Sequence, residues 1–447
     1  MAVVVVPVGL DMGPVFEEAG RPDRLPMRYE VHLGGEPQEL TAQQYTAWLA
    51  AFGSPERHAD PGVDRASLEG DLRNGPAGPA GPVADPAPVV QDLLDRSMLL
   101  EYDPDAMDEK VFGAFRLYPR AHGLGSTPER PEHYGIGYPG DTFAEVGPTV
   151  YQLLSLSLTF PALWYAFEDM AEAERGDPPP GGPRSAAEIG RVLGVVLPSL
   201  VCSGAAFLDA LNYEPPELDP VTPDGRTTPD RSESSVIVPV GLNMGEDCTA
   251  RDPDDDPDAA RWLVHHGTNW AELDPEESAA YLAAFNERER QERGELNRHS
   301  LARLLRASDR SAEPEPAIDR LLDRGLLVEY DPETGPFEQL FRGLQLFPLG
   351  HGLGNTAEHP GRYRIGIAGA PELWVGPEVY AIWSYSLTGR SLWDACADLA
   401  EGADEDLQEG EEPLGYRPDD LAAAVAEVLP GMIAHGCAFL DPLNYVQ

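Results

Sequence analysis

The sequence predicts an α+β fold in which one module of about 110 residues occurs four times, arranged as two pairs. First, four stretches share a pattern: an apolar residue, a Pro, a short Gly-containing loop, and then an aromatic residue that opens a short strand ending at Gly. They lie at 6–15 with 29–35, 118–127 with 134–140, 238–247 with 262–267, and 347–356 with 363–369. Second, three segments with helical periodicity and a closing apolar run follow each stretch.

The repeats place the module boundaries. Modules 1 to 4 occupy 1–110, 111–214, 236–338 and 339–447, and a Pro- and Asp-rich linker occupies 215–235. Module 1 ends in LLEYDP and module 3 in LLVEYDP, whereas module 2 ends in AAFLDALNY and module 4 in CAFLDPLNY. This pairing of ends indicates that one module duplicated and diverged, and that the resulting pair duplicated again.

Composition restricts the classes of function. The chain carries 77 acidic and 32 basic residues, for a net charge of −45, which opposes long-range attraction to nucleic-acid phosphates. There is no apolar run near 20 residues, so no transmembrane helix and no membrane partner are expected. The start MAVVVVPVGL lacks a basic segment typical of a signal peptide, and the four cysteines form no CxxC motif. These features predict a cytoplasmic protein with reduced thiols.

In module 1 we expect strands at 3–8 and 28–33, helices at 41–52, 64–72 and 89–97, and a strand that begins at 98. The first helix follows a Thr that serves as N-cap and carries Tyr45, Trp48 and Phe52 at helical spacing. This aromatic stripe is more typical of a core than of a surface for stacking bases. The segment 74–88, NGPAGPAGPVADPAP, is expected to be a loop.

The other modules repeat this plan. Module 2 is expected to hold a strand at 112–118, helices at 147–157, 162–174 and 186–203, and a closing strand at 205–213. In module 3 the helices are expected at 275–285, 300–307 and 316–324. In module 4 they are expected at 376–386, 391–401 and 418–433.

The text PELWVGPEVYAIWSYSLTGRSLWDACADLA in module 4 carries a resemblance to a known architecture. A strand precedes a helix with Val379, Tyr380, Ile382 and Trp383 on it, a Thr-Gly break follows, and Ser391 caps the next helix. This order resembles the winged helix, and in particular the PqqD-like peptide-recognition domains, in which strands precede the helices. The resemblance implies four tandem winged-helix-like units in two pairs, which recognise a protein or peptide partner.

The two loops HGLGST and HGLGNT are the sharpest local motifs. Their backbone N–H groups could hold an anion, and the candidate binding residues are His122 and Tyr134 in module 2 and His351 and Tyr363 in module 4. The alternative is a glycine turn with packed histidines, because the loop is expected between two strands and lacks the spacing of phosphate-binding motifs.

Catalytic and metal motifs are missing from the sequence. The histidine separations do not match the spacings of zinc sites, and the acidic insert at 252–258 lacks the Gly and terminal Glu of an EF-hand loop. There is no GxSxG motif. We therefore predict no catalytic residue, no metal and no cofactor, and the HGLGxT loop is the only pointer to an enzyme or an enzyme's accessory subunit.

Module 3 has an arginine-rich stretch. Nine arginines and eight acids lie between 288 and 324, a net charge of +1 in a strongly acidic chain. The candidate DNA contacts are Arg298, Arg303, Arg306, Arg320 and Arg324. The alternative is a solvated helical face with ion pairs between side chains.

Two hypotheses follow for the function. The first is a non-catalytic binding or scaffold protein, whose exposed sheet edges take up a protein or peptide partner. The second is a DNA-binding transcriptional regulator that uses the arginines of module 3, although the net charge disfavours nucleic acid.

Overall fold

The structure is a computed structural model that describes residues 3–21, 24–53, 63–75, 78–179, 181–211, 235–249, 261–286, 296–308, 313–367, 372–387, 391–403 and 414–443. Most of the predicted linker, the acidic insert at 252–258, and Arg288, Arg290, Arg293 and Arg310 lie outside these residues. The described residues form a mixed helix and strand fold, as the predicted α+β class requires. The assignment to winged helices stays a prediction.

The chain divides into two compact units. Unit 1 comprises Met1–Pro215 and Gly352–Pro360, and unit 2 comprises Pro216–His351 and Gly361–Gln447. The segment Gly352–Pro360 is held in unit 1 by the side chain of Asn355. Its Oδ1 accepts from the N–H of Phe16 at 2.7 Å, and its Nδ2 donates to the carbonyl of Phe16 at 2.9 Å.

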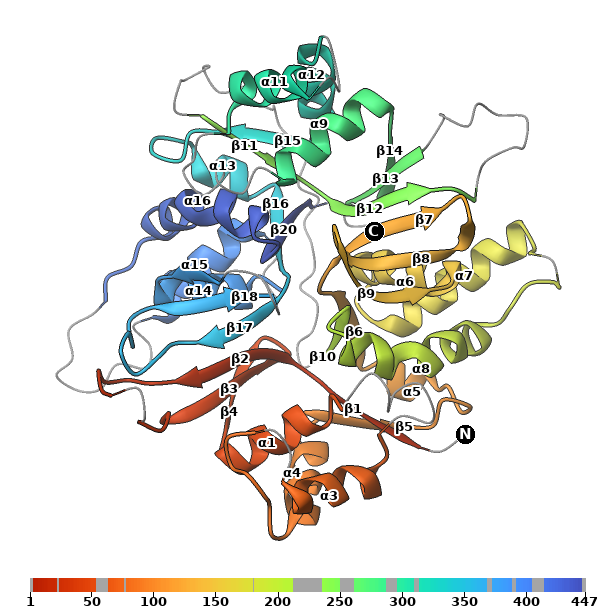
Figure 1. Cartoon of the computed structure of the whole chain (residues 1–447), viewed down its shortest axis with the longest axis vertical. Coiled ribbons are helices and arrows are strands. Elements are labelled where there is room, and N and C mark those ends of the chain that lie inside the picture. The colour runs from red at the N-terminus through yellow and green to blue at the C-terminus, as the bar shows by residue number, and fades with distance from the viewer. Residues whose placement is uncertain are drawn as a thin grey trace. The chain divides into compact units, whose positions relative to one another are not determined.

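In the described residues the same order of elements occurs in every module: a strand, a strand meander, three longer helices and a closing strand (Figure 1). Module 1 contains β1 Val4–Pro7, β2 Leu10–Val15, β3 Arg28–Leu33, β4 Glu36–Leu40, α1 Ala42–Ala50, α3 Arg65–Asn74, α4 Pro86–Asp95 and β5 Leu99–Tyr102. Module 2 contains α5 Glu109–Phe112, β6 Phe115–Pro119, β7 His122–Thr127, β8 Arg130–Tyr138, β9 Asp141–Val146, α6 Pro148–Thr159, α7 Leu163–Gly176, α8 Ala186–Cys202 and β10 Ala206–Ala210.

Modules 3 and 4 have the same order. Module 3 contains β11 Val236–Pro239, β12 Leu242–Asp247, β13 Arg261–His266, β14 Asn269–Leu273, α9 Pro275–Asn286, α11 Arg298–Ala307, α12 Glu315–Asp323 and β15 Leu327–Tyr330. Module 4 contains α13 Phe337–Phe341, β16 Leu344–Pro348, β17 His351–Gly354, β18 Tyr363–Gly366, β19 Leu373–Val375, α14 Pro377–Tyr385, α15 Leu392–Gly402, α16 Pro418–Ala434 and β20 Ala438–Pro442.

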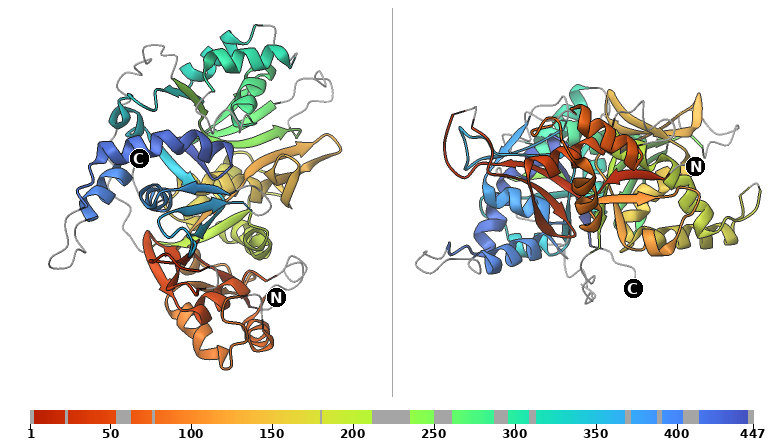
Figure 2. Two further views of the ribbon diagram at one scale, coloured as in Figure 1. Left: turned by 60° about the vertical axis from the view of Figure 1, so that its left-hand side comes forward. Right: turned by 90° about the horizontal axis from the view of Figure 1, so that it is seen from below.

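The first strand of each module pairs with its last strand, antiparallel: β1 with β5, β6 with β10, β11 with β15 and β16 with β20. The strands between form antiparallel meanders, β2–β3–β4, β7–β8–β9 and β12–β13–β14, and β18 pairs with β19. The three orange helices of module 1 gather beside its red strands in both further views (Figure 2). In module 3 the buried residues of these helices and strands form one hydrophobic cluster, which includes Ile237, Tyr281 and Leu321.

The helices lie close to their predicted positions because their periodicity and caps are local signals. Thr41 and Gln44 form a capping box at the start of α1, and Ser185 and Glu188 form one at α8. The helix α4 begins three residues before the predicted 89, because Pro86 occupies its first turn, where a missing N–H costs nothing.

The predicted glycine loops are strands, which corrects the sequence interpretation. HGLGST lies in β7, and HGLG of the second motif forms β17. The glycines mark bulges in antiparallel ladders: the register shifts between Asp11 and Gly13, between Gly123 and Gly125, and between Asn243 and Gly245. At Gly13, Gly125 and Gly245 φ lies between 72° and 74°, the left-handed region that only Gly adopts without strain.

The predicted aromatic core is confirmed. Tyr45 and Trp48 are buried, and the indole N–H of Trp48 donates to the carbonyl of Val8 at 3.0 Å. In module 4 the indole N–H of Trp383 donates to the carbonyl of Cys437 at 2.8 Å. In both modules a tryptophan of the first helix is thus hydrogen-bonded to backbone next to a strand. The four cysteines are free thiols, and three of them are buried. In the described part of the chain, every helix is too short or too polar to cross a membrane.

Candidate functional site

The predicted binding tyrosines lie at the packed interface between a meander and the first helix of its module. Tyr134 stacks on Tyr151 with ring centroids 4.4 Å apart, and Tyr363 stacks on Tyr380 at 4.6 Å. Tyr29 and Tyr45 form the same pair in module 1 at 4.5 Å. Tyr134 is buried and Tyr363 is half-buried. These rings hold helix and sheet together, and they offer little surface to a ligand.

The predicted histidines are also part of the packing. His122 is buried on β7 opposite Gly137, and its ring lies edge-on to Tyr138 at 5.9 Å. Burial lowers the pKa of His122 to about 4, so the ring is neutral at pH 7. His351 begins β17 and is half-buried.

The position of the buried histidine alternates between modules. In modules 1 and 3 it lies on the second meander strand, where His32 faces Leu10 and His265 faces Leu242. In module 2 it lies on the first strand, where His122 faces Gly137. Burial lowers the pKa of His32 and of His265 to about 4 as well. One imidazole fills the same place from either strand, which favours a packing role over a shared catalytic one.

Two buried carboxylates were not singled out from the sequence. Asp209 on β10 accepts from the backbone N–H of Gly34 at 2.8 Å, and Asp441 on β20 accepts from that of Gly267 at 3.0 Å. Burial raises the pKa of Asp209 to about 7 and that of Asp441 to about 8. The repeated text FLDAL and FLDPL contained this signal, since a charged residue recurs there in an apolar strand.

A third buried carboxylate has a cationic neighbour. Asp11 accepts from the hydroxyl of Tyr45 and from the N–H of Gly13, both at 2.9 Å, and burial raises its pKa to about 6. Arg120 is also buried, and burial lowers its pKa to about 10 while Asp11 stabilises its charge. Both groups are therefore ionised at pH 7, within unit 1.

Unit 2 replaces both members of this pair. In the repeat, VPVGLNMG aligns with VPVGLDMG and FPLGHGLG with YPRAHGLG, so Asn243 stands at the place of Asp11 and Leu349 at the place of Arg120. Asn243 keeps the turn contact, because its Oδ1 accepts from the N–H of Gly245 at 3.2 Å. Because unit 2 replaces the anion and the cation together, the two charges have a role in packing and not in a chemistry that all modules share.

Among the described residues, no three or more His, Cys, Asp and Glu side chains gather as metal ligands would. The side chains of Asp11, Asp209 and Asp441 are buried, so a substrate in solvent has no direct contact with them.

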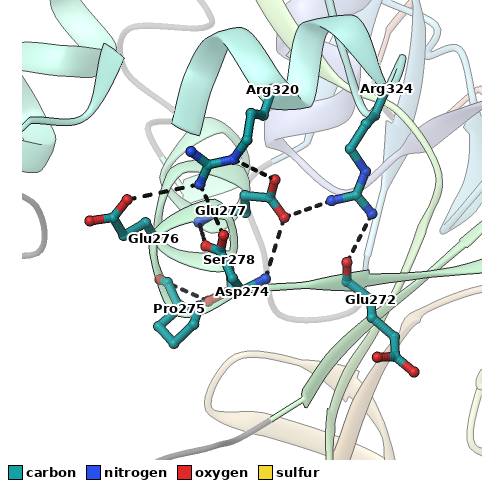
Figure 3. Close-up of polar contacts among 8 residues, drawn as sticks. All are labelled: Glu272, Asp274, Pro275, Glu276, Glu277, Ser278, Arg320 and Arg324. Carbon is teal, nitrogen blue, oxygen red and sulfur yellow. Dashed lines mark hydrogen bonds and ion pairs between the residues drawn. The ribbon is translucent and has the colours of Figure 1, made fainter. Parts of the chain in front are cut away.

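The arginines of module 3 are engaged in ion pairs. Arg320 and Arg324 project from α12 toward the start of α9 (Figure 3). There Arg320 bonds to Glu277 at 3.0 Å and to Asp274 at 2.9 Å, and Arg324 bonds to Glu277 at 2.6 Å. Glu277 is 4% exposed, so one buried carboxylate joins two guanidinium groups.

The other candidate DNA contacts divide into paired and exposed residues. Arg298 pairs with Glu329 at 2.8 Å and with Asp319, and Arg306 pairs with Glu315. Arg303 is exposed, and no described residue forms an ion pair with it. Four of the five candidate arginines thus have their charge compensated by acids of module 3.

The sheet edges are the most accessible regular backbone. Among the described strands, β4, β9, β14 and β19 each pair on one side only. They are short, and exposed residues make up most of β4 and half of β9. An unpaired row of N–H and C=O groups is a template for another strand. These edges are the candidate binding site.

Comparison of the chain with protein-family models finds no match, and comparisons with curated proteins and with solved structures find none either.

Proposed function

We propose that this chain is a non-catalytic binding protein that recognises an extended segment of a protein partner by strand addition at the edges of its meanders. The observation that carries the proposal is the presence of a short edge strand at the end of the meander in every module. Main-chain hydrogen bonds to such an edge supply affinity, and neighbouring side chains supply selectivity.

The placement of the titratable groups supports binding over catalysis. The carboxyl and imidazole groups with the largest shifts in pKa are buried, where they contact backbone and packed rings. The acids at the surface, in contrast, are exposed on the meander hairpins, such as Glu36 and Asp141. An acidic surface favours a partner with positive charge.

The experiment is an affinity selection from a displayed library of random linear peptides on the intact chain, followed by hydrogen exchange of the chain with and without a selected peptide. We expect enriched peptides that slow exchange at amides of one or more of β4, β9, β14 and β19. A selection without enrichment, or protection confined to helices, would contradict strand addition.

DNA binding is the alternative that the sequence leaves open. The ion pairs of Arg298, Arg306, Arg320 and Arg324 favour the first proposal, because each phosphate contact would have to replace an existing carboxylate partner.

A further inference from the structure

The four modules differ in the residue at the C-cap of their third helix. This position is Arg96 after α4 in module 1, Arg324 after α12 in module 3, Ser203 after α8 in module 2 and His435 after α16 in module 4. The C-cap is structurally equivalent in the modules, so that the side chains can be compared directly.

In modules 1 and 3 the C-cap arginine bonds to the backbone of the edge strand. Arg96 donates to the carbonyl of Glu39 on β4 at 3.3 Å, and Arg324 donates to the carbonyl of Glu272 on β14 at 2.8 Å. A guanidinium on an edge carbonyl occupies an acceptor that an added strand would need, and it places a positive charge there. We name this contact the arginine guard.

Module 2 lacks the guard. Ser203 donates its hydroxyl to the carbonyl of Leu200 in its own helix at 3.1 Å. Arg130 is the guanidinium near β9, and it pairs at 2.7 Å with the carboxylate of Glu145 rather than with the backbone. The carbonyls along the outer side of β9 therefore have no side-chain donor among the described residues.

The hairpin of β8 and β9 is acidic. Between Arg130 and Val146 it carries three acids, all exposed, and one arginine, a net charge of −2. The acids are Glu132, Asp141 and Glu145. Counted over the two strands in the same way, the other hairpins have net charges of −2 at 28–40, zero at 261–273 and zero at 363–375.

The edge β19 of module 4 is different again. The guanidinium groups of Arg362 and Arg364 lie 5.6 and 5.7 Å from the ring centroid of Trp374 on that strand. Glu372 compensates the charge of Arg364 at 3.3 Å, and the cation of Arg362 would repel a basic partner at β19.

We infer that β9 is the edge that accepts the partner, and that the partner segment is extended and rich in Arg or Lys. This inference rests on the proposed function and adds which edge is used and what charge the partner carries. The ladder of β8 and β9 has a bulge at Phe143, since Ile136 faces Ala144 and Gly137 faces Thr142. The bulge interrupts the regular edge, so ion pairs to Asp141, and to Glu145 in place of its exposed pair with Arg130, must supply a large share of the affinity.

The probe is a fluorescent peptide of about eight residues, the length of an ordinary strand, with alternating Arg and Val. The matched acidic probe has Glu in place of Arg. Binding of both to the intact chain is measured by fluorescence anisotropy, and hydrogen exchange locates the contact. We expect the basic probe to bind, to slow exchange at β9, and to weaken with added salt, and the acidic probe not to bind.

Two variants close or neutralise the edge. Ser203→Arg installs the guard of modules 1 and 3 in module 2, and D141N/E145Q removes the two carboxylates of β9 without altering side-chain size. Each is expected to raise the Kd of the basic probe at least about tenfold. The matched controls on the exposed face of α7 are Ala173→Arg and E172Q/D177N, which change the net charge equally and are expected to shift the Kd less than about threefold.

The reciprocal variant removes a guard. Arg96→Ser frees the carbonyl of Glu39, and we expect the basic probe to slow exchange at β4 in this variant only.

If the controls weaken binding as much as the β9 variants do, the probe responds to overall charge and the assignment of β9 is overturned, while strand addition by other peptides survives. If the probe does not bind but selected peptides protect another edge, the inference fails alone. If no peptide is selected, the proposed function fails with it. If circular dichroism shows that Ser203→Arg does not fold, the binding of the basic probe to D141N/E145Q decides whether β9 is the edge.

Discussion

Asp209 accepts a hydrogen bond from the backbone N–H of Gly34 at 2.8 Å, which joins the last strand of module 2 to the β3–β4 turn of module 1. Asp441 makes the same bond to Gly267 at 3.0 Å between modules 4 and 3. Beside each bond the backbone continues the connection, since Gly9 donates to the carbonyl of Leu208 and Gly241 to that of Leu440, both at 2.7 Å. The buried aspartate thus fastens two modules within each unit.

These aspartates predict that stability falls as pH rises through neutrality. The pKa of Asp209 is raised from 3.8 to about 7, so the folded state retains a proton that the unfolded state has lost. The stabilisation is complete below pH 4 and is lost between about pH 4 and 7, or about pH 8 for Asp441. Asp209→Asn and Asp441→Asn keep an acceptor without a charge, so each should be more stable than the native chain at pH 8, by roughly 1–3 kcal/mol, and by clearly less at pH 5.

Urea unfolding at the two pH values measures this difference. Glu172→Gln removes one exposed carboxylate and controls for the general effect of net charge, since it should alter stability little at either pH. A loss of stability in Asp209→Asn that is equal at pH 5 and pH 8 would show that the ionised carboxylate is the native form.

The buried pair of Asp11 and Arg120 predicts strong coupling between two substitutions. Arg120→Leu removes the cation that helps to keep the buried carboxylate of Asp11 ionised and should destabilise the chain by about 1–3 kcal/mol. D11N/R120L reproduces the residues that unit 2 holds at these places, Asn243 and Leu349, and should recover most of that loss. A double-mutant cycle from urea unfolding measures the coupling, and additive losses would mean that the two charges do not interact.

The network around Glu277 predicts that a buried ion pair contributes more to stability than an exposed one. Glu277→Ala leaves Arg320 and Arg324 without their shared buried carboxylate and should cost about 1–3 kcal/mol of unfolding free energy. The exposed pair of Arg417 and Asp420 provides the comparison, and Asp420→Ala should leave thermal unfolding unchanged. Equal effects of the two substitutions would show that burial of Glu277 adds nothing.

The same pairs predict weak binding to nucleic acid. With four of the five candidate arginines paired and a net charge of −45, the intact chain should not shift duplex DNA in a gel even at low salt. A shift that Arg303→Ala and Arg298→Ala abolish would instead support the regulator hypothesis, whereas loss in an exposed control such as Arg73→Ala would indicate nonspecific contact.

The sequence predicted the helices well because the signals for helices are local. The capping boxes at Thr41 and Ser185 and the stripe of Tyr45 and Trp48 lie within a few residues of what they determine. The edge strands were not predicted, since the polar text of β4, EPQEL, has no apolar alternation to mark it. The glycine motifs were read as loops because a bulge glycine and a turn glycine have the same conformational preference, and only the partner strand distinguishes them.

The sequence by itself determined the repeat, the module order and the positions of the helices, because repetition and periodicity are properties of the chain text. Tertiary structure decided which strands pair, that Asp209 and Asp441 become buried, and that the arginine guards reach β4 and β14 but not β9. These outcomes depend on contacts between residues far apart in the chain, such as Gly34 and Asp209, whose proximity arises only when strands pair and a core excludes water.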